Sequence, residues 1–358
     1  MESKRKSVIL QVTENCNLQC IYCYQTHNQE GCADLQTLIS IITRELDTHD
    51  AFDEVEFDFI GGEPLLEFDL IRNTCERVWN NDFTKPYIFF ATTNGTLLTP
   101  EMKKWFTTHR QQFWLGLSID GTKQMHDLNR CNSYSNIDID FFRENWPDQT
   151  IKMTISPLTL SNLAEGIIEL TQKGFKVAAN LAYGVDWNHK DYPDIFGREL
   201  EKLANYYLEN SGKEPVMLMD MPLYKVARKE VSQYCGTGSG MVAYNTTGLK
   251  FPCQMFYTIT FDDNLIWENT SFDKVHLDYY TNCYEKNIFP VCPMCVGMNL
   301  KESGETHKCD RYLCDMMKVL VKANAWFKSK RLKDQNYAEK HAGVLEDTVQ
   351  ALRIIKTL

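Results

Sequence analysis

The first half of the chain alternates strand-like and helix-like stretches, and this alternation limits the fold more than any other feature. Thr99-Pro100 is typical of a helix start, and Gly174 of the end of a helix over 163–173. Repeated strand–helix units build a parallel sheet covered by helices. Six units are too few for a closed eight-fold barrel, so we predict an α/β fold with an open, partial (β/α)6 TIM-like barrel. The expected strands are Val8–Thr13, Val55–Ile60, Tyr87–Thr92, Phe113–Ile119, Ile151–Ser156 and Lys176–Ala182.

Three cysteines follow the first predicted strand within one short loop, CNLQCIYC at 16–23. Active sites of such barrels lie where strands end, so Cys16, Cys20 and Cys23 are placed to hold an inorganic centre. A structural zinc site needs four ligands, whereas a four-iron cluster held by three cysteines leaves one iron open to a small chelating molecule. A zinc knuckle or a chance group of free thiols are the alternatives.

Short polar motifs follow the next three predicted strands. Gly61-Gly62-Glu63 comes after the second strand, where glycines let the backbone approach a ligand and a carboxylate can accept from an ammonium group. Asn94 follows the third strand, and Ser118 and Asp120 follow the fourth. Gly-Gly and Asn-Gly alone are ordinary turn signals. Their shared position after successive strands is the stronger indication of a site.

The CxxxCxxC spacing, with the aromatic Tyr22 before its last cysteine, resembles the signature of the radical SAM family. In that family the open iron binds the amino and carboxylate groups of S-adenosylmethionine (SAM), and the cluster's electron cleaves the sulfonium to a 5′-deoxyadenosyl radical. The resemblance implies that Glu63 meets the methionine amino group. We expect His126 to be structural. The other residues that the resemblance implies for the cofactor pocket are Tyr22, Gly61, Gly62, Asn94, Ser118 and Asp120.

Seven of the thirteen cysteines lie between residues 235 and 314. Strand-like segments around Thr247-Gly248 predict a β-hairpin that brings Cys235 and Cys253 together. The pattern CxnGx4C that ends at Cys253 resembles the opening of the SPASM extension, which carries auxiliary iron–sulfur clusters in peptide- and protein-modifying radical SAM enzymes. Of the cysteines outside both motifs, Cys75 is expected in the core.

The chain departs from the usual SPASM continuation, CxxCx5Cx3C plus one more cysteine. Position 301 is lysine, and no cysteine follows Cys314. Asp310 stands where the pattern places a ligand, and a carboxylate can replace a thiolate. The resemblance implies one auxiliary cluster on Cys235, Cys253 and Cys314, and a second on Cys292, Cys295, Cys283 and either Cys309 or Asp310. A single auxiliary cluster with spare thiols is the alternative.

The motifs divide the chain into four parts. We expect a barrel core over 1–188, a helical connector over 189–232, a SPASM-type module over 233–318 and a helical tail over 319–358. The tail carries an apolar stripe, which favours a face docked on the barrel over a partner-binding helix. The stripe consists of Leu345, Val349, Leu352 and Ile355.

Composition limits the partners and the compartment. A net charge of −10 argues against nucleic acid, because phosphate binding needs a basic stripe. The apolar stretch near the start is too short for a signal peptide, and no apolar run is long enough to span a membrane, so we expect neither. Many cysteines without a secretory signal indicate metal or cluster ligation in a reducing cytoplasm.

Three functions compete under the resemblance. A maturase of a ribosomally made peptide would form a C–C or C–S (thioether) crosslink, and an auxiliary cluster would accept the extra electron. An anaerobic sulfatase-maturing enzyme would form formylglycine, but such enzymes commonly carry an Asp base at the position that Gln254 occupies here. Glutamine cannot take a proton at neutral pH. A non-catalytic electron-transfer protein would explain the cysteines but not the Gly61-Gly62-Glu63 motif.

The maturase hypothesis carries further expectations. It implies three 4Fe–4S clusters, one SAM-binding and two auxiliary, and SAM itself. The partners would be a precursor peptide and an external electron donor such as flavodoxin or ferredoxin. Because the first strand begins near residue 7, we expect no N-terminal leader-binding domain, so a separate protein would present the leader, or the barrel and SPASM surfaces would bind the peptide directly.

Overall fold

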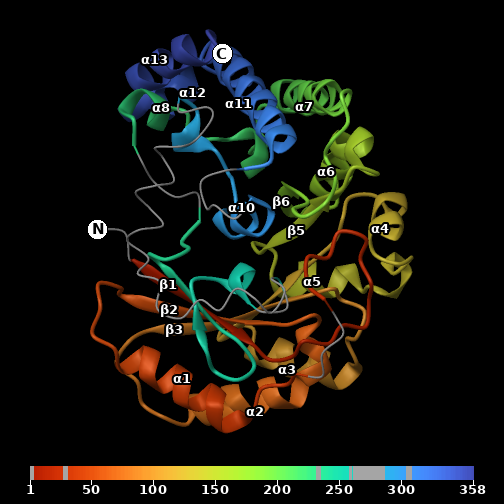
Figure 1. The fold of residues 1–358 in the computed structure, drawn as a ribbon, viewed down its shortest axis with the longest axis vertical. Coiled ribbons are helices and arrows are strands. Elements are labelled where there is room, and N and C mark those ends of the chain that lie inside the picture. The colour runs from red at the N-terminus through yellow and green to blue at the C-terminus, as the bar shows by residue number, and fades with distance from the viewer. Residues whose placement is uncertain (1–3, 27–30, 231–234, 258–259, 261–286, 304–308) are drawn as a thin grey trace. The chain divides into compact units, whose positions relative to one another are not determined.

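The computed structural model describes residues 4–26, 31–230, 235–257, 260, 287–303 and 309–358. These residues fall into two compact units, which are described separately. The first unit contains Met1–Ile119, Arg130–Lys152 and Gly236–Phe272, and the second contains Asp120–Asn129, Met153–Cys235 and Asp273–Leu358. Figure 1 shows their elements. No described helix has the length and apolar character needed to cross a membrane.

The first unit is built on a six-stranded sheet in the order β4-β3-β2-β1-β7-β8. All its strand pairs are parallel except the antiparallel β7–β8 hairpin. The ladder that joins β1 to β2 pairs Ile9 with Asp58 and Gln11 with Ile60. The strands are β1 Arg5–Gln11, β2 Glu54–Ile60, β3 Tyr87–Thr93, β4 Phe113–Leu117, β7 Met241–Tyr244 and β8 Lys250–Phe251.

The first three helices lie on one side of this sheet (Figure 1). They are α1 Leu35–Asp47, α2 Phe68–Trp79 and α3 Pro100–His109, and α5 Ile139–Asn145 belongs to the same unit. Thr99 caps α3 as predicted, because its side chain accepts a hydrogen bond from the Met102 N–H. Asp34 and Asp138 cap α1 and α5 in the same way, whereas α2 starts without a side-chain cap.

Alternation along β2 separates a helix-facing side from a barrel-interior side. Phe59 is fully buried and stacks with Phe89 and Phe113, with ring centroids 5.5 and 6.1 Å apart. Phe113 in turn contacts Phe106 of α3, with centroids 5.2 Å apart. Side chains alternate across a strand, so Asp58 and its even-numbered neighbours Glu56 and Ile60 face the opposite side, the interior of the partial barrel.

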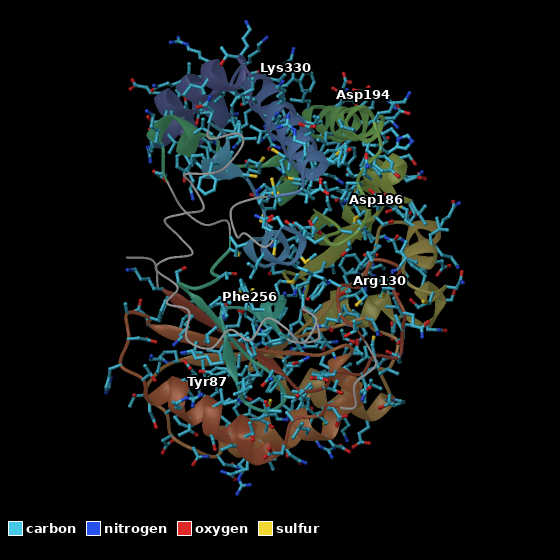
Figure 2. The ribbon with its side chains drawn as sticks, viewed as in Figure 1. Tyr87, Arg130, Asp186, Asp194, Phe256 and Lys330 are labelled. Carbon is cyan, nitrogen blue, oxygen red and sulfur yellow. The ribbon has the colours of Figure 1, made fainter. Side chains whose placement is uncertain are left out.

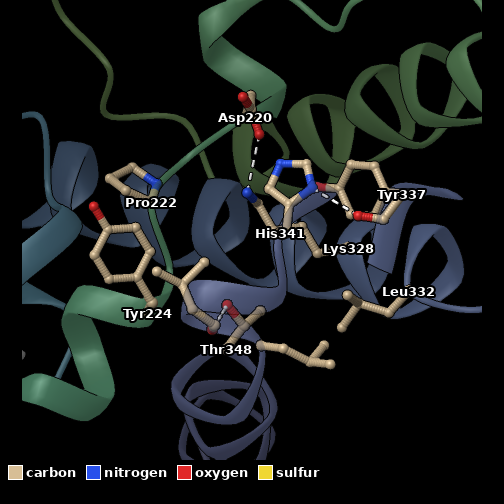
Figure 3. Close-up of a pocket in the computed structure, with 10 residues that line it drawn as sticks. Asp220, Pro222, Tyr224, Lys328, Leu332, Tyr337, His341 and Thr348 are labelled. Atoms are coloured by element: carbon tan, nitrogen blue, oxygen red, sulfur yellow. Dashed lines mark hydrogen bonds and ion pairs between the residues drawn. The ribbon is translucent and has the colours of Figure 1, made fainter. Parts of the chain in front are cut away.

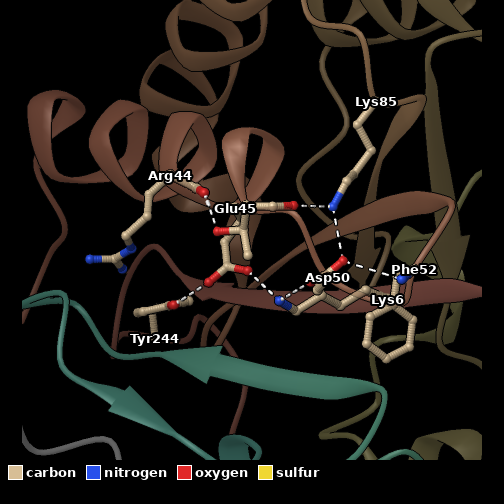
Figure 4. Close-up of polar contacts among 8 residues, drawn as sticks. Lys6, Arg44, Glu45, Asp50, Phe52, Lys85 and Tyr244 are labelled. Carbon is tan, nitrogen blue, oxygen red and sulfur yellow. Dashed lines mark hydrogen bonds and ion pairs between the residues drawn. The ribbon is translucent and has the colours of Figure 1, made fainter.

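The β7–β8 hairpin confirms the predicted turn at Thr247-Gly248, and Gly248 has the positive φ of 81° that suits glycine. The sequence did not predict that β7 would extend the sheet by pairing with β1. Figure 4 shows part of what holds it there: Glu45 of α1 accepts hydrogen bonds from Tyr244 of β7 and from Lys6 of β1. Burial alone would raise the pKa of Glu45, but these two bonds lower it below its usual value.

The remaining two predicted barrel strands, β5 Thr150–Ile155 and β6 Lys176–Leu181, form a two-stranded sheet, and the second unit contains β6 and the part of β5 from Met153 onward. A single bridge between Ser118 and Lys152, both in the first unit, joins the end of β4 to β5. All six predicted strands are therefore confirmed. The α-helices of this unit are α4 Lys123–Asn129, α6 Leu163–Gln172, α7 Tyr192–Glu209, α8 Tyr224–Arg228, α10 Val296–Ser303, α11 Arg311–Arg331, α12 Gln335–Lys340 and α13 Leu345–Ile355.

The C-terminal stripe differs from the prediction. Helix α13 packs against α8 and α11 within the second unit. Its buried side chains are Thr348, Ala351 and Ile355, of which only Ile355 belongs to the predicted stripe, whereas Val349 is 37% exposed. An ion pair between Arg228 and Asp347, 2.7 Å long, also joins α8 to α13. The side of α13 that is buried therefore differs from the predicted apolar side. Small or short side chains such as Ala351 and Thr348 let α13 pack closely against its neighbouring helices.

Candidate active site

One cavity of about 240 Å³ in the first unit collects most of the predicted site residues. It lies at the carboxyl ends of β1 to β4, where barrel active sites are expected. Asp120 belongs to the second unit and is the one predicted cofactor-pocket residue that does not line this cavity. The predicted residues that line it are Cys16, Cys20, Tyr22, Cys23, Gly61, Gly62, Glu63, Asn94 and Ser118.

The three cysteines of the loop all line this cavity. Cys16 and Cys20 are half-buried and Cys23 is exposed. Burial raises the pKa of the Cys16 thiol to about 11, and the charge of Cys23 adds to the rise. Within the described residues, no group of three His, Cys, Asp or Glu side chains lies close enough together to hold a metal ion. The donor set still fits a three-cysteine cluster, because all three thiols open onto the same space and soft thiolates suit iron–sulfur centres.

The turn at Gly61 and Gly62 fits against the cysteine loop with no room for a side chain. A Cβ on Gly62 would lie 2.3 Å from the Asn15 carbonyl oxygen and 2.7 Å from the Cys16 Cβ, and one on Gly61 would lie 2.7 Å from the Thr13 carbonyl oxygen. The Glu63 N–H also donates to the Asn15 carbonyl, at 2.9 Å. The two glycines therefore bring the Glu63 turn against the loop that carries the thiols.

Glu63 is only 1% exposed and is oriented by three donors. Its Oε1 accepts from the Thr93 hydroxyl at 2.7 Å and from the Leu65 N–H at 3.0 Å, and its Oε2 accepts from the Asn94 N–H at 2.8 Å. Burial raises the pKa of the Glu63 carboxyl, while these bonds and the Arg130 charge oppose the rise. A carboxylate has about four acceptor positions, so Glu63 keeps room for one more donor.

Neighbouring segments fix the cysteine loop from two sides. Asn94 donates to the side chain of Asn17 at 2.9 Å, and Asn17 donates to the Thr96 hydroxyl at 2.8 Å. On the other side, the Cys131 thiol donates to the Gln19 carbonyl at 3.0 Å, although Cys131 matched no motif in the sequence. The loop is therefore pre-positioned before any ligand binds.

Arg130 is a pocket residue to which sequence reasoning assigned no role, and it is labelled in Figure 2. Its guanidinium lies 5.5 Å from the centre of the Tyr22 ring. Burial raises the pKa of both Cys16 and Glu63, and the Arg130 charge opposes this rise. A cation in a pocket that also holds Glu63 suits a ligand with both a carboxylate and an ammonium group. The clue in the sequence was its position shortly after the fourth strand.

Asp120 and His126 have structural partners within the second unit. Asp120 is fully buried, and its two oxygens accept from the Thr154 N–H at 2.9 Å and the Asn129 amide at 3.0 Å. Nδ1 of His126 accepts from the Asp120 N–H at 3.2 Å, and His126 is also fully buried, as a structural role requires. A role for Asp120 in cofactor binding stays a prediction.

The cysteines of the second motif lie in both units. Cys253, 3% exposed, belongs to the first unit, whereas Cys235, Cys292, Cys295, Cys309 and Cys314 belong to the second. Burial and the charge of Cys235 raise the pKa of Cys295 to about 11. Asp310 caps α11 by accepting from the Tyr312 N–H at 2.6 Å. Cys283 lies outside the described residues, so the auxiliary ligand sets stay predictions. The predicted core position of Cys75 is confirmed.

A second cavity, of about 150 Å³, lies among the C-terminal helices of the second unit (Figure 3). Its polar groups bond to one another: Lys328 donates to Asp220 at 2.9 Å, and the His341 ring lies 2.8 Å from the Tyr337 carbonyl oxygen. Thr348 donates to the Val344 carbonyl at 2.7 Å. We therefore interpret this cavity as a gap in the packing of the helices and not as a ligand site.

Known proteins resemble this chain in both sequence and fold. A family model described as a 4Fe-4S single cluster domain matches residues 5–130. A cysteine-type anaerobic sulfatase-maturating enzyme of Clostridium novyi is 33% identical over 139 residues, which cover 35% of this chain and 35% of that relative. The chain thus spans about a third of that relative's length in the match.

Two further matches extend over most of the chain. The radical SAM cyclopropyl synthase TigE of Paramaledivibacter caminithermalis is 20% identical over 356 residues, covering 88% of this chain and 73% of that protein. The solved structure of native anSMEcpe with bound AdoMet and Cp18Cys peptide has a TM-score of 0.69 and 20% identity, covering 97% of this chain and 99% of that one. Together with the partial barrel and the cysteine loop, these matches show that the chain is similar in sequence to a radical SAM protein and shares the fold of anSMEcpe.

Proposed function

We propose that this protein is a radical SAM peptide maturase that crosslinks a ribosomally made peptide through a C–C or C–S bond. The observation that favours a crosslink over formylglycine is the position of Gln254, which lines the same pocket as the cysteine loop. Sulfatase maturases commonly carry an Asp base at this position, and a glutamine amide accepts no proton at neutral pH.

The proposed cofactors are SAM and three 4Fe–4S clusters, with Cys16, Cys20 and Cys23 holding the SAM-binding one. When bound, SAM and this cluster supply a 5′-deoxyadenosyl radical. Glu63 would accept from the methionine ammonium, because its buried carboxylate keeps an open acceptor position. The Arg130 guanidinium would attract the methionine carboxylate, and Tyr22, beneath it, would hold Arg130 in place. A precursor peptide and an external electron donor complete the proposed system.

Glu63→Gln is expected to weaken SAM binding about ten-fold or more, because a charge-assisted hydrogen bond contributes about 1.5–3 kcal/mol. SAM affinity would be measured by equilibrium binding to the anaerobically reconstituted protein. Glu144→Gln, at an exposed position on α5, serves as the matched control. Equal affinities for wild type and Glu63→Gln would mean that the Gly-Gly-Glu turn is only structural.

The product distinguishes the candidate reactions. The enzyme would be incubated with SAM, a reductant and a short peptide encoded by a neighbouring gene, and the product analysed by mass spectrometry. A crosslink is expected to lower the peptide mass by two hydrogens, with fragment ions that span the joined residues. Unchanged mass with deuterium uptake from solvent would instead indicate epimerisation.

Sulfatase maturation is the second candidate, because the Clostridium novyi relative is a sulfatase-maturating enzyme. Formylglycine made from serine also lowers the mass by two hydrogens, and from cysteine it exchanges sulfur for oxygen with loss of two hydrogens. Fragment ions would then place the whole change on one residue. That result would contradict the crosslinking proposal while leaving the radical SAM chemistry intact.

A further inference from the structure

Buried polar atoms without a partner are concentrated in the interior of the partial barrel. Within the described residues, seven buried side-chain nitrogen or oxygen atoms have no hydrogen-bond partner, and four of them belong to Gln11, Asp58 and Gln254. These are both polar atoms of the Gln11 amide, Oδ1 of Asp58 and Oε1 of Gln254. Such atoms lower the stability of a fold, so their clustering requires an explanation.

The three residues face the same space. Asp58 and Gln254 both line the cavity that holds the cysteine loop. Gln11 is 1% exposed and pairs in the ladder with Ile60, which lines that cavity too. Residues directly paired in a sheet point to the same side, so Gln11 is directed toward the barrel interior.

Asp58 is separated along β2 from the turn that carries Glu63. Asp58 precedes Gly61, the first residue beyond β2, by three positions, or roughly 10 Å along a strand. The Glu63 carboxylate is oriented instead by Leu65, Thr93 and Asn94 at the strand ends. The interior atoms thus remain available to a second ligand.

The surroundings of Asp58 disfavour a cationic ligand. Burial raises the pKa of its carboxyl to about 7, the nearby Lys152 charge lowers it and Glu56 raises it. Lys152 already supplies a cation to the cavity, donates to the Thr92 hydroxyl at 2.8 Å and lies 5.5 Å from the Phe90 ring centre. A neutral group with both a donor and an acceptor matches the available atoms best.

We propose that Gln11, Asp58 and Gln254 form a subsite that holds an amide group of the peptide substrate. The oxygens of Asp58 and Gln254 accept from the amide N–H, and the Gln11 amide donates to its carbonyl. The subsite rests on the proposed peptide substrate and names the residues that select the segment presented to the radical.

The first test is thermal stability, which needs no knowledge of the peptide sequence. Gln11→Met and Asp58→Leu replace the unpartnered polar atoms with apolar atoms in side chains of similar shape, so each is expected to raise the unfolding midpoint by about 1–3 °C. Asn324→Leu is the control: Asn324 is also fully buried, but it accepts from the Met221 N–H at 3.1 Å and donates to the Leu218 carbonyl at 2.9 Å. This control is expected to lower the midpoint.

The effect of Asp58→Leu is also expected to depend on pH. An unfolded aspartate ionises near pH 4, whereas folding raises the pKa of Asp58 to about 7. Between these values the folded wild type binds more protons than the unfolded chain, so its stability falls as pH rises. The gain from Asp58→Leu should therefore be larger at pH 8 than at pH 5. A lower midpoint for these variants would mean that ordered water or the fold satisfies the atoms, and would overturn the subsite.

The second test is direct binding to the SAM-loaded, reconstituted enzyme. The probe is N-acetylglycine methylamide, and the comparison compound is N-acetylglycine methyl ester, which lacks one amide N–H. The wild type is expected to bind the amide several-fold more tightly than the ester, and the Gln11→Met/Asp58→Leu double variant should bind it at least ten-fold more weakly than the wild type does. The proposal would be overturned if the wild type and the double variant bound the amide equally tightly, or if neither bound it.

SAM affinity separates this proposal from the proposed function. The double variant should bind SAM with wild-type affinity, because Glu63 and Arg130 are unchanged. A large loss of SAM affinity would assign the interior atoms to the cofactor and overturn the peptide subsite. A wild type that binds SAM and cleaves it but modifies no peptide would contradict the maturase proposal, whatever the stability results.

Discussion

Simultaneous replacement of Cys16, Cys20 and Cys23 by alanine is expected to remove about four of about twelve irons and all SAM cleavage. The three cysteines line one pocket and are the proposed protein ligands of this cluster, so the triple variant keeps none of them. Iron and sulfide analysis, the visible absorbance and the yield of 5′-deoxyadenosine would measure the effect.

The control is Cys32→Ala, which removes an exposed thiol outside both cysteine motifs. It should leave the iron content and SAM cleavage at the wild-type level. Stoichiometric zinc in the wild type with no brown absorbance would contradict the iron–sulfur assignment at every cysteine. Loss of about twelve irons from the triple variant would show that the auxiliary clusters depend on the first cluster. Cys292 and Cys295 would then be replaced separately to test the auxiliary ligands.

Gly62→Ala is expected to produce the second largest effect. The new methyl group would lie 2.3 Å from the Asn15 carbonyl oxygen and 2.7 Å from the Cys16 Cβ, and neither is the end of a flexible side chain. The backbone must move, which displaces the Glu63 turn from the cysteine loop. We expect the free energy of unfolding to fall by about 1–3 kcal/mol and SAM affinity to fall at least ten-fold.

Chemical denaturation and SAM binding to the reconstituted protein would measure these two changes. Gly212→Ala provides the matched control, since a Cβ there meets no atom within 4 Å. Its effect on stability should lie within about 0.5 kcal/mol. If the Gly62→Ala variant had the SAM affinity and the free energy of unfolding of the wild type, neither SAM binding nor stability would require close contact between the Glu63 turn and the cysteine loop.

The sequence predicted those features that depend on local pattern. All six strands, the Thr99 cap, the helix end at Gly174 and the Thr247-Gly248 hairpin are present, because alternation, capping and turn chemistry act within a few residues. The pocket was predictable too, since the polar motifs follow strands that lie side by side in a parallel sheet.

Features that depend on distant pairing were not predictable. Nothing near Met241–Tyr244 indicates that this strand will join β1. The interior position of Asp58 depends on which side of β2 the helices cover, and an alternating strand does not reveal this alone. Similarly, the buried face of α13 was set by its contact with α8, not by its most apolar stripe.

The β1–β7 ladder also has a consequence for folding during synthesis. Leu10 pairs with Tyr244, so one edge of β1 stays without its strand partner until more than two hundred further residues have been added. At about 5–20 residues per second, that interval lasts roughly ten to fifty seconds. An apolar strand edge left open for so long can pair with other chains. The nascent protein should therefore depend on chaperones during this interval, and a fragment that stops before residue 241 should aggregate instead of folding as an independent barrel.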